Sequence, residues 1–429
     1  MKKSICVVGL GYIGLPTAVM FANHGHMVHG VDVNASVVEH IQNKRLHIEE
    51  NGLQERLNKA IDSNSLTVST TPIQADVFII AVPSPIKADK TANLEYIRSA
   101  TQAITPFVEK GNLVVLESTV PPRTVKDIMI PELVKTGLAI GTDIFVSHSP
   151  ERVIPGRVFE ELVSNDRIIG GVNEQSAQMT SELYRSFVVG QMHETDDTTA
   201  ELVKVMENTY RDVNIALANE LAKIAQTIDV NVWEAIRLAN FHPRVNIHQP
   251  GPGVGGHCIA VDPWFLVELN PGLAKIIHTA RQTNDGMPAY TAQLTADILK
   301  AHGITQPKVA ALGLAFKGNI DDMRESPSVD VVEQLQHNEL QVTAYDPHIK
   351  TNHIAVQTQN LQEALEEASA IVVLTSHDEF MALDPVQVGK HMAHRVIIDT
   401  KNCIERSKWE QAGFAVYVLG DSKNSKLQK

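Results

Sequence analysis

Short runs of consecutive apolar residues punctuate the first third of the chain. They occupy residues 5–8, 27–32, 75–85, 111–121 and 143–147. Continuous hydrophobicity of this kind is typical of parallel strands that are buried on both faces of a sheet. The segment 17–24, which follows the first run, is predicted to be a helix. This pattern indicates a doubly wound α/β domain at the beginning of the chain.

From Thr195 the spacing of apolar residues changes to that of a long helix. They recur at Leu202, Val205, Met206, Val213, Leu217, Leu221 and Ile224. Asp196, Asp197 and Thr198 provide capping and helix-dipole chemistry at its start. We expect a helix of roughly 30 residues or more, longer than most helices of globular proteins. Further helical segments are expected over 232–240 and 273–302.

Beyond Gln306 the pattern of the first domain returns in a weaker form. Runs at 308–317, 342–346, 368–377 and 396–401 repeat, in order, four of the earlier runs. The predicted fold class is therefore α/β, with two doubly wound Rossmann-like domains joined by a helical central region that contains the long helix. The predicted domains are 1–192, 193–302 and 303–429.

The charge balance bears on the partners of the protein. The chain of 429 residues has 37 Lys and Arg against 50 Asp and Glu, a formal net charge of −13. This balance argues against a general nucleic-acid or membrane-surface binder, but it permits a small anionic ligand held by a few local cations. No metal site is expected.

Cysteine usage and the N-terminal sequence favour a cytoplasmic protein. The three cysteines, Cys6, Cys258 and Cys403, are too few for a disulfide framework and fit a reducing compartment. Glycines interrupt the first apolar run, so it does not resemble a signal peptide. No apolar stretch approaches the roughly 20 residues that a membrane span needs.

The first strand ends in a dinucleotide-binding fingerprint. Gly9, Gly11 and Gly14 enclose Tyr12 and Ile13 at the start of the predicted helix, and Asp32 ends the next strand. Glycines permit a tight turn and close approach of a pyrophosphate, while the acid accepts from the ribose hydroxyls. Because Asp32 would repel a 2′-phosphate, NAD is favoured over NADP as the cofactor.

Other polar residues follow the predicted strands at the ligand-binding edge of the sheet. Ser84 and Thr119 come after two of the strands, and Glu151 with Arg152 follows a third. Ordinary turn chemistry and a solvated ion pair are the competing explanations. On the long helix Lys204 and Asn208 share one face, although Glu201 is close enough in sequence to pair with the lysine.

A glycine-rich stretch, 250–263, joins the helices of the central region. It contains four glycines, Gly251, Gly253, Gly255 and Gly256. Their number rules out a regular helix or strand and suggests a backbone that passes close to another group. Cys258 lies at its end, where a thiol would stand at the mouth of a pocket, although most lone cysteines are inert core residues. A cysteine nucleophile together with NAD suggests oxidation past the aldehyde, through a thiohemiacetal and a thioester.

Eight motifs spread over nearly the whole chain resemble those of the UDP-glucose/GDP-mannose 6-dehydrogenase family. They are Gly9–Pro16, Glu117–Pro121, Pro150–Arg152, Lys204-x-x-x-Asn208, Gly255–Cys258, Asn284–Asp285, Phe316–Lys317 and Arg324–Ser326. Segments 207–216, 242–247 and 249–258 resemble the branch that oxidises UDP-N-acetylmannosamine for bacterial capsule or enterobacterial common antigen. The resemblance implies an enzyme that takes a UDP-N-acetylhexosamine and two NAD per sugar. The long central helix suggests a homodimer interface.

The resemblance also implies a role for each site residue. Cys258 would be the nucleophile, Lys204 and Asn208 oxyanion-stabilising donors, Asp285 a proton-transfer partner of Lys204, and Thr119 and Glu151 the groups that place water. Substrate contacts would come from Arg152, Val153, Lys204, Asn208, Arg211, His242, Arg244, Gly255 and Lys317. Cofactor contacts would come from Gly9, Gly11, Tyr12, Ile13, Gly14, Asp32, Ser84, Thr119 and Arg324.

Two departures from the family pattern narrow the substrate. Where the glucose-oxidising branch has a serine before its cysteine and a lysine shortly after, this chain has His257 and Val261 with Asp262. Ser84 stands where a threonine is usual, which keeps the hydroxyl. The first departure argues against UDP-glucose, and UDP-N-acetylglucosamine remains the alternative substrate. A non-catalytic NAD or nucleotide-sugar binder and a 3-hydroxyacid dehydrogenase remain as alternatives of other classes, although neither has a use for Cys258.

Overall fold

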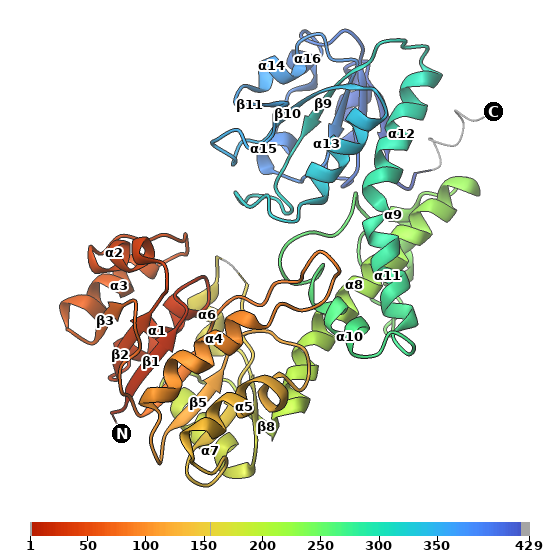
Figure 1. Ribbon diagram of the computed structural model, residues 1–429. Coiled ribbons are helices and arrows are strands. Elements are labelled where there is room, and N and C mark those ends of the chain that lie inside the picture. Colours follow the sequence, from red (N-terminus) through yellow and green to blue (C-terminus); the bar gives the residue numbers. More distant parts are fainter. Residues whose placement is uncertain (1, 155, 422–429) are drawn as a thin grey trace. The chain divides into compact units, whose positions relative to one another are not determined.

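The computed structural model describes residues 2–154 and 156–421. The chain forms two compact units, one made of residues 1–207 and 264–270, the other of 208–263 and 271–429 (Figure 1). Each unit is built around its own parallel sheet, which confirms the predicted fold class. The predicted domain limits at 192 and 302 stay a prediction.

The first unit contains an eight-stranded sheet in its described part, ordered β3-β2-β1-β4-β5-β6-β7-β8. The strands are β1 Ser4–Val8, β2 Met27–Val31, β3 Leu66–Ser69, β4 Val77–Ile80, β5 Leu113–Leu116, β6 Phe145–His148, β7 Arg167–Gly171 and β8 Met192–Asp196. Neighbours pair in parallel, except that β6 and β7 are antiparallel. Parallel pairing brings the carboxyl ends of β1, β4, β5 and β6 to one edge, where the fingerprint and the polar turns lie.

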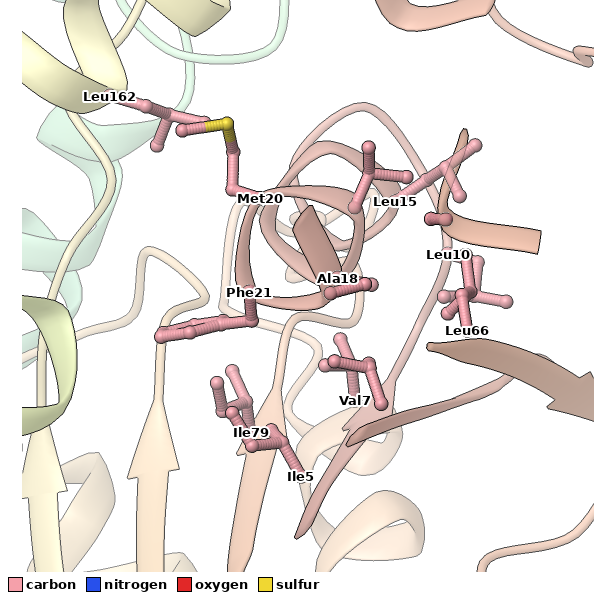
Figure 2. Packing of buried hydrophobic residues seen from close by; sticks show 14 of the residues in the cluster. Ile5, Val7, Leu10, Leu15, Ala18, Met20, Phe21, Leu66, Ile79 and Leu162 are labelled. Carbon is pink, nitrogen blue, oxygen red and sulfur yellow. The ribbon is translucent and has the colours of Figure 1, made fainter. Parts of the chain in front are cut away.

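Helices cover this sheet and bury its apolar residues. They are α1 Gly14–Asn23, α2 Ala35–Gln42, α3 Leu53–Asp62, α4 Glu95–Ile104, α5 Ile130–Leu133, α6 Val158–Ser164 and α7 Glu174–Tyr184, with short turns η1 Thr105–Phe107, η2 Val125–Met129 and η3 Val134–Thr136. A further helix, α10, spans Asp262–Leu269. Figure 2 shows Ala18 and Phe21 on the side of α1 that faces Val7 and Ile79. All four side chains are fully buried, so this packing fixes the glycine turn that precedes α1.

The second unit contains a six-stranded, all-parallel sheet, ordered β11-β10-β9-β12-β13-β14 in the described residues. Its strands are β9 Lys308–Leu312, β10 Gln341–Tyr345, β11 Gln357–Thr358, β12 Ala370–Val373, β13 Val396–Asp399 and β14 Ala415–Val418. Its helices are α9 Val232–Ala239, α11 Lys275–Asp285, α12 Met287–Ala301, α13 Pro327–His337, α14 Leu361–Leu365, α15 Asp378–Met381, α16 Pro385–Val388 and α17 Arg406–Gln411. The order repeats the β3-β2-β1-β4-β5 arrangement of the first sheet, as expected for a second doubly wound domain.

The long helix predicted from Thr195 is confirmed. It is α8, Asp197–Thr227, with 31 residues. Its small buried residues Ala218 and Ala222 form a cluster with Val232 of α9 and Leu419, which follows β14. The indole nitrogen of Trp233 donates to the carbonyl of Leu419 at 2.8 Å, so α9 is fastened to the end of the second sheet.

A membrane span is not among the described elements. No helix in residues 2–154 and 156–421 is both long and apolar enough to cross a bilayer.

Candidate functional site

The fingerprint turn leaves space at its middle glycine. Gly9 has φ +93°, and a Cβ there would lie 2.5 Å from the carbonyl oxygen of Ala81. A Cβ at Gly14 would lie 1.8 Å from the carbonyl oxygen of Gly9, whereas one at Gly11 would meet nothing within 4 Å. Helix α1 begins after Ile13 without a side-chain cap. The turn thus offers open space and uncapped N–H groups, which is what a pyrophosphate requires.

Asp32 lies at the end of β2 beside this turn. Its Oδ2 accepts from the amide of Leu10 at 3.0 Å, and its Oδ1 accepts from the amide of Asn34 at 2.9 Å. The side chain is only partly buried, and Tyr12 of the turn is 44% exposed. A carboxylate offers about four lone-pair sites. Asp32 therefore keeps acceptor capacity for the hydroxyls of a ribose.

Ser84 and Thr119, predicted separately at the ends of two strands, are brought together. The hydroxyl of Ser84 donates to the carbonyl of Thr119. Both residues are partly buried in turns that follow β4 and β5. Their contact joins the two turns at the edge of the sheet that also carries the fingerprint.

Glu151 belongs to a buried polar network that the sequence did not reveal. The guanidinium of Arg167 on β7 donates to Glu117 at 2.8 Å, to Glu151 at 3.0 Å and to Ser149 at 2.8 Å. It also lies 4.0 Å from the ring centre of Tyr184, whose hydroxyl donates to Glu117 at 2.5 Å. The alternative that Glu151 forms a solvated ion pair is wrong, because it is 9% exposed and its partner Arg167 is buried.

The charges in this network shift the pKa of Glu117. Burial raises it to about 7, although the positive charge of Arg167 opposes the shift. Two carboxylates share one guanidinium, so the fully ionised group of three carries one net negative charge. Desolvation is the main cause of the raised pKa, and the negative charge of Glu151 adds to it.

Arg152 and Val153 lie in the loop after Glu151. The guanidinium of Arg152 donates to Glu207 of α8 at 3.0 Å and to the carbonyl of Asp166 at 3.2 Å. Val153 packs against the apolar core beneath α1. In the structure, Arg152 is thus held by Glu207 on the long helix.

Lys204 is half-buried on α8, and its expected competitor does not pair with it. Glu201 is fully buried, and its carboxylate accepts from the backbone amides of Arg123 and Val125. Burial raises the pKa of Glu201 to about 8. Burial and, to a smaller extent, the positive charge of Lys204 lower the pKa of the buried His148 to about 3. The interpretation of Lys204 as a solvated partner of Glu201 is therefore wrong.

In the second unit, the glycine-rich stretch packs tightly against the turn that follows β9. A Cβ at Gly255 would lie 2.4 Å from the carbonyl oxygen of Glu325, and one at Gly256 would lie 2.8 Å from the ring of Phe316. Gly253 and Gly256 also have φ values of +143° and +83°. The close approach predicted for these glycines is thus an approach to the protein's own chain.

Cys258 is exposed at the end of this stretch, and Asp262 follows one turn later. The carbonyl of Cys258 accepts from the amides of Val261 and Asp262 at 3.0 and 2.9 Å. The side-chain amide of Asn208 on α8 donates to the carboxylate of Asp262 at 2.6 Å in a buried contact. Asn208 is therefore linked to the turn that carries Cys258 through an acid that the sequence interpretation passed over.

Asp285 lies in a different network at the end of α11. Its carboxylate pairs with Arg281, whose guanidinium also donates to Asp212 of α8 at 2.5 Å. Arg281 is fully buried, whereas the side chain of Asp285 is 47% exposed. The amide of Asn284 donates to Asp212 at 2.8 Å. Arg281 thus pairs with two acids at once, one buried and one exposed.

The other predicted substrate contacts of this unit are exposed cations and a histidine. Arg211 is exposed on α8, and His242 and Arg244 are exposed in the turn after α9. The backbone amide of Arg244 donates to the Nδ1 of His242 at 3.3 Å, which joins these two residues locally.

The turn between β9 and α13 carries the two predicted basic residues. Lys317 is exposed, and Arg324 donates to Asp322 at 2.7 and 2.9 Å. The ring of His257, just before Cys258, lies 3.8 Å from the same Asp322. Burial and the charge of Arg324 lower the pKa of His257.

A further basic side chain, Lys401 after β13, lies beside the glycine-rich stretch. A Cβ at Gly251 would lie 3.1 Å from its Nζ. Desolvation lowers the pKa of Lys401. No sequence pattern singles out this residue, because only the fold brings it next to Gly251.

One cluster has a spacing suitable for a metal ion. The nearest ligand atoms of His348, His377 and Glu379 lie within 4.8 Å of one another. However, the Nε2 of His377 donates to Asp346 at 3.0 Å, and its Nδ1 accepts from the amide of Asn319 at 2.9 Å. Both ring nitrogens are thus occupied, and hydrogen bonding explains the cluster without an ion.

Three family models match the chain in succession. They describe the NAD binding, central and UDP binding domains of the UDP-glucose/GDP-mannose dehydrogenase family, over residues 3–188, 198–286 and 310–406. A protein of Methanococcus maripaludis called UDP-N-acetyl-D-mannosamine dehydrogenase is 50% identical over 98% of this chain and 97% of its own. A protein of Ralstonia solanacearum called NDP-N-acetyl-D-galactosaminuronic acid dehydrogenase is 45% identical over 93% and 96%.

Solved structures agree with these matches. The UDP-N-acetyl-mannosamine dehydrogenase Cap5O of Staphylococcus aureus has a TM-score of 0.90 and 46% identity, covering 98% of this chain and 100% of that one. A UDP-glucose dehydrogenase of Pyrobaculum islandicum has a TM-score of 0.84 and 27% identity, covering 98% of both chains.

Proposed function

Because the chain belongs to the UDP-glucose/GDP-mannose dehydrogenase family, we propose that it oxidises C6 of UDP-N-acetyl-D-mannosamine to a carboxylate. The product is UDP-N-acetyl-D-mannosaminuronate. The enzyme class, an NAD-dependent oxidoreductase, follows from the family. The choice of sugar is supported by the names of the relatives that cover nearly the whole chain.

The first unit fits NAD. The open space at Gly11, the uncapped start of α1 and the remaining acceptor capacity of Asp32 match a pyrophosphate and a ribose. Bound NAD supplies the hydride acceptor for each of the two oxidations. We assign Gly9, Gly11, Tyr12, Ile13, Gly14, Asp32, Ser84, Thr119 and Arg324 to its binding.

Cys258 is the proposed nucleophile for the second half of the reaction. Its thiolate adds to the C6 aldehyde that the first oxidation produces, and a C–S bond forms in a thiohemiacetal. Loss of the C6 hydride and the hydroxyl proton then leaves a thioester. Water adds to the thioester carbon, the C–S bond breaks, and the carboxylate and the thiolate are released.

The contact between Asn208 and Asp262 is the observation that most favours catalysis over simple binding. It places a buried carboxylate and an amide one helical turn from an exposed cysteine. We propose that Asn208 and Lys204 stabilise the developing oxyanions. Asp262 is a better candidate than Asp285 for the acid that exchanges protons beside Asn208, because Arg281 already neutralises Asp285.

Thr119 and Glu151 are proposed to place the hydrolytic water. Arg167 and the amide of Arg152 fix the carboxylate of Glu151, so that its orientation does not depend on solvent. A fixed acceptor beside the thioester orients a water molecule without reorganisation during the reaction.

Substrate contacts are proposed for residues of both units. They are Arg152, Val153, Lys204, Asn208, Arg211, His242, Arg244, Gly255 and Lys317. Exposed cations such as Arg211 and Lys317 suit the charged diphosphate of the substrate.

Counting NADH per sugar tests the covalent scheme. The unaltered protein should form two NADH for each UDP-N-acetyl-D-mannosamine consumed, whereas C258A should not complete the second oxidation. Two NADH per sugar at the normal rate in C258A would contradict the scheme. For K204A we expect kcat to fall about a hundredfold or more with the fold intact, and unchanged activity would remove Lys204 from the mechanism.

A panel of UDP sugars separates this proposal from its alternatives. UDP-N-acetylglucosamine is the alternative substrate. The galacto epimer is included because the Ralstonia relative is named for a galactosaminuronic acid. Equal kcat/KM values for the three epimers would contradict the preference for the manno sugar. Absence of NADH production with every UDP-hexosamine would favour a non-catalytic binder.

The quaternary state and cellular role are also proposed. Met206, Tyr210, Leu217 and Ile224 form an exposed apolar stripe along α8, and repeats of four and seven residues place them on one face. We propose that two copies form a homodimer through this face, and that the cytoplasmic enzyme supplies capsule or common-antigen synthesis. Light scattering of I224E against the unaltered protein tests the dimer.

A further inference from the structure

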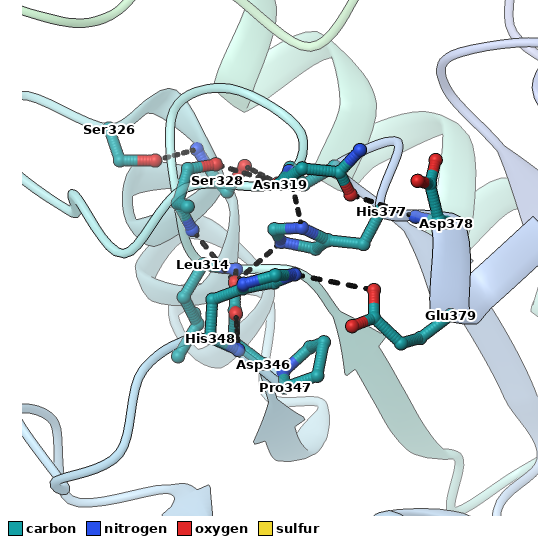
Figure 3. A network of polar contacts seen from close by, with 12 residues as sticks. Leu314, Asn319, Ser326, Ser328, Asp346, Pro347, His348, His377, Asp378 and Glu379 are labelled. Carbon is teal, nitrogen blue, oxygen red and sulfur yellow. Dashed lines mark hydrogen bonds and ion pairs between the residues drawn. The ribbon is translucent and has the colours of Figure 1, made fainter. Parts of the chain in front are cut away.

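A buried histidine in the second unit joins two strand ends to the turn that carries Lys317. His377 follows β12 and is fully buried. Its Nδ1 accepts from the backbone amide of Asn319 at 2.9 Å, and its Nε2 donates to the carboxylate of Asp346 after β10 at 3.0 Å. Figure 3 shows the ring between these two partners, with the ring of His348 stacked against it.

The same turn is anchored on the other side of Lys317. The carboxylate of Asp346 accepts from the amides of Leu314 and Ala315 at 2.7 and 3.0 Å. The carbonyl of Ala315 accepts from the hydroxyl of Thr375 at 2.7 Å. The segment is therefore fixed two residues before Lys317, at a strand end that His377 also binds.

The part of the turn that follows Lys317 is also held by defined contacts. Asn319 has φ +61°, a left-handed conformation, and its side-chain oxygen accepts from the amide of Asp378 at 3.0 Å. A Cβ at Gly318 would lie 2.2 Å from the carbonyl oxygen of Ser376. A left-handed residue persists where its surroundings hold it, and here the amide of Asn319 is held by the ring of His377.

Asp346 is buried and is not accessible to a ligand. Its four hydrogen bonds come from Leu314, Ala315, His377 and the amide of His348. Three of them reach its Oδ2 and one reaches its Oδ1. Burial opposes the ionisation of Asp346, yet these donors hold its pKa at about 2. The pair of Asp346 and His377 therefore acts on the turn and not on a bound molecule.

We propose that His377 is a positioning residue for phosphate binding, which holds the turn 314–319 so that Lys317 is presented to the diphosphate of a UDP sugar. This inference rests on the proposed function, in which Lys317 contacts the substrate. The side chain of His377 does not itself touch the ligand. Loss of the His377 side chain would free the amide of Asn319, and Asn319 could then leave its left-handed conformation. Lys317 would be ordered only when the ligand binds, and this ordering would weaken binding.

Titration calorimetry with UDP on the full chain tests the inference. For H377L we expect UDP to bind about tenfold more weakly, with the Kd for NAD within about twofold of the unaltered value. H377Q, whose amide can both accept and donate, should recover part of the affinity. H394L is the matched control, since His394 is an exposed histidine of the same unit, and should bind UDP normally.

A double-mutant cycle with K317A distinguishes positioning from a general loss of structure. If His377 acts through Lys317, then adding H377L to K317A should weaken UDP binding by less than about twofold. The KM for the UDP sugar should rise in H377L while kcat is retained. Should H377L not fold, the same cycle is run with H377Q, for which a smaller non-additive loss is expected.

The outcomes that overturn the inference are distinct from those that overturn the function. Normal UDP affinity in H377L and H377Q, or full additivity with K317A, would overturn the positioning role alone. Absence of UDP binding by the unaltered protein would overturn the proposed substrate class and the inference with it.

Discussion

Replacing Glu117 by glutamine should change how the stability of the first unit depends on pH. Glu117 and Glu151 share the guanidinium of Arg167. Glutamine keeps an oxygen for Arg167 and for the hydroxyl of Tyr184, but it has no charge to desolvate. Glu151 remains as the counter-ion of Arg167, so E117Q leaves a neutral pair in place of a group with one excess negative charge.

The sign and the size follow from the pKa of Glu117, which burial raises from 4.5 to about 7. The folded protein holds this proton more tightly than the unfolded chain does. The resulting stabilisation is fully present below pH 4.5 and is lost as the pH rises to about 7. A shift of this size corresponds to about 3 kcal/mol in the free energy of unfolding.

Urea unfolding at a series of pH values measures this difference. Between about pH 4.5 and 7.5 the unaltered protein should lose about 3 kcal/mol relative to E117Q, and above that range the two curves should run parallel. Hydrogen exchange of peptides from β5 and β7 assigns the change to the first unit. E194Q is the control, because Glu194 is exposed on β8. Parallel curves through the whole range would refute the reasoning.

Four further substitutions probe the second unit. D262N should lower kcat about a hundredfold, whereas D285N should lower it less than about tenfold. If steady-state assays show a larger loss of kcat for D285N than for D262N, the proton-transfer role returns to Asp285. R281L should cost about 3–5 kcal/mol of unfolding free energy, because it leaves Asp212 buried without its cation; an unchanged urea midpoint would contradict this. G256A should lower the melting temperature, since φ is +83° there, and an unchanged thermal melt would show that the turn adapts.

The strands that the sequence predicted are the central ones. Continuous apolar runs such as those of β4 and β5 can only be buried, so composition alone identifies them. The edge strands were not predicted. β8, with the sequence MHETD, is mostly exposed, and β11 has two residues. In these two edge strands little hydrophobic signal is left to detect.

Some features of the candidate site are visible in the sequence, and others appear only in the fold. The glycine fingerprint and the face shared by Lys204 and Asn208 are local patterns, which a sequence displays directly. The contact of Asn208 with Asp262 joins residues 54 positions apart, and the ion pair of Arg167 with Glu117 joins residues 50 apart. Spacing carries no information about such pairs, because they depend on how the chain folds back.

The glycines of the stretch 250–263 show how a correct prediction can have a different cause. Their number did predict close approach of the backbone to another group. The structure shows that the groups approached are Phe316, Glu325 and Pro327 of the protein itself. Packing against these residues holds the turn that carries Cys258 next to the turn that carries Lys317, within one compact unit.

A comparison of Asp32 with Asp346 explains why two sheets of the same strand order suit different ligands. Both acids follow the strand beside the first strand of their sheet, and both accept from the glycine turn. Asp32 accepts two hydrogen bonds and is partly exposed, which leaves room for ribose hydroxyls. Asp346 accepts four, one of them from His377, and is buried. Burial of Asp346 removes the ribose contact that a dinucleotide needs. The same hydrogen bonds hold the turn beside Lys317, the residue that we assign to the diphosphate of a UDP sugar.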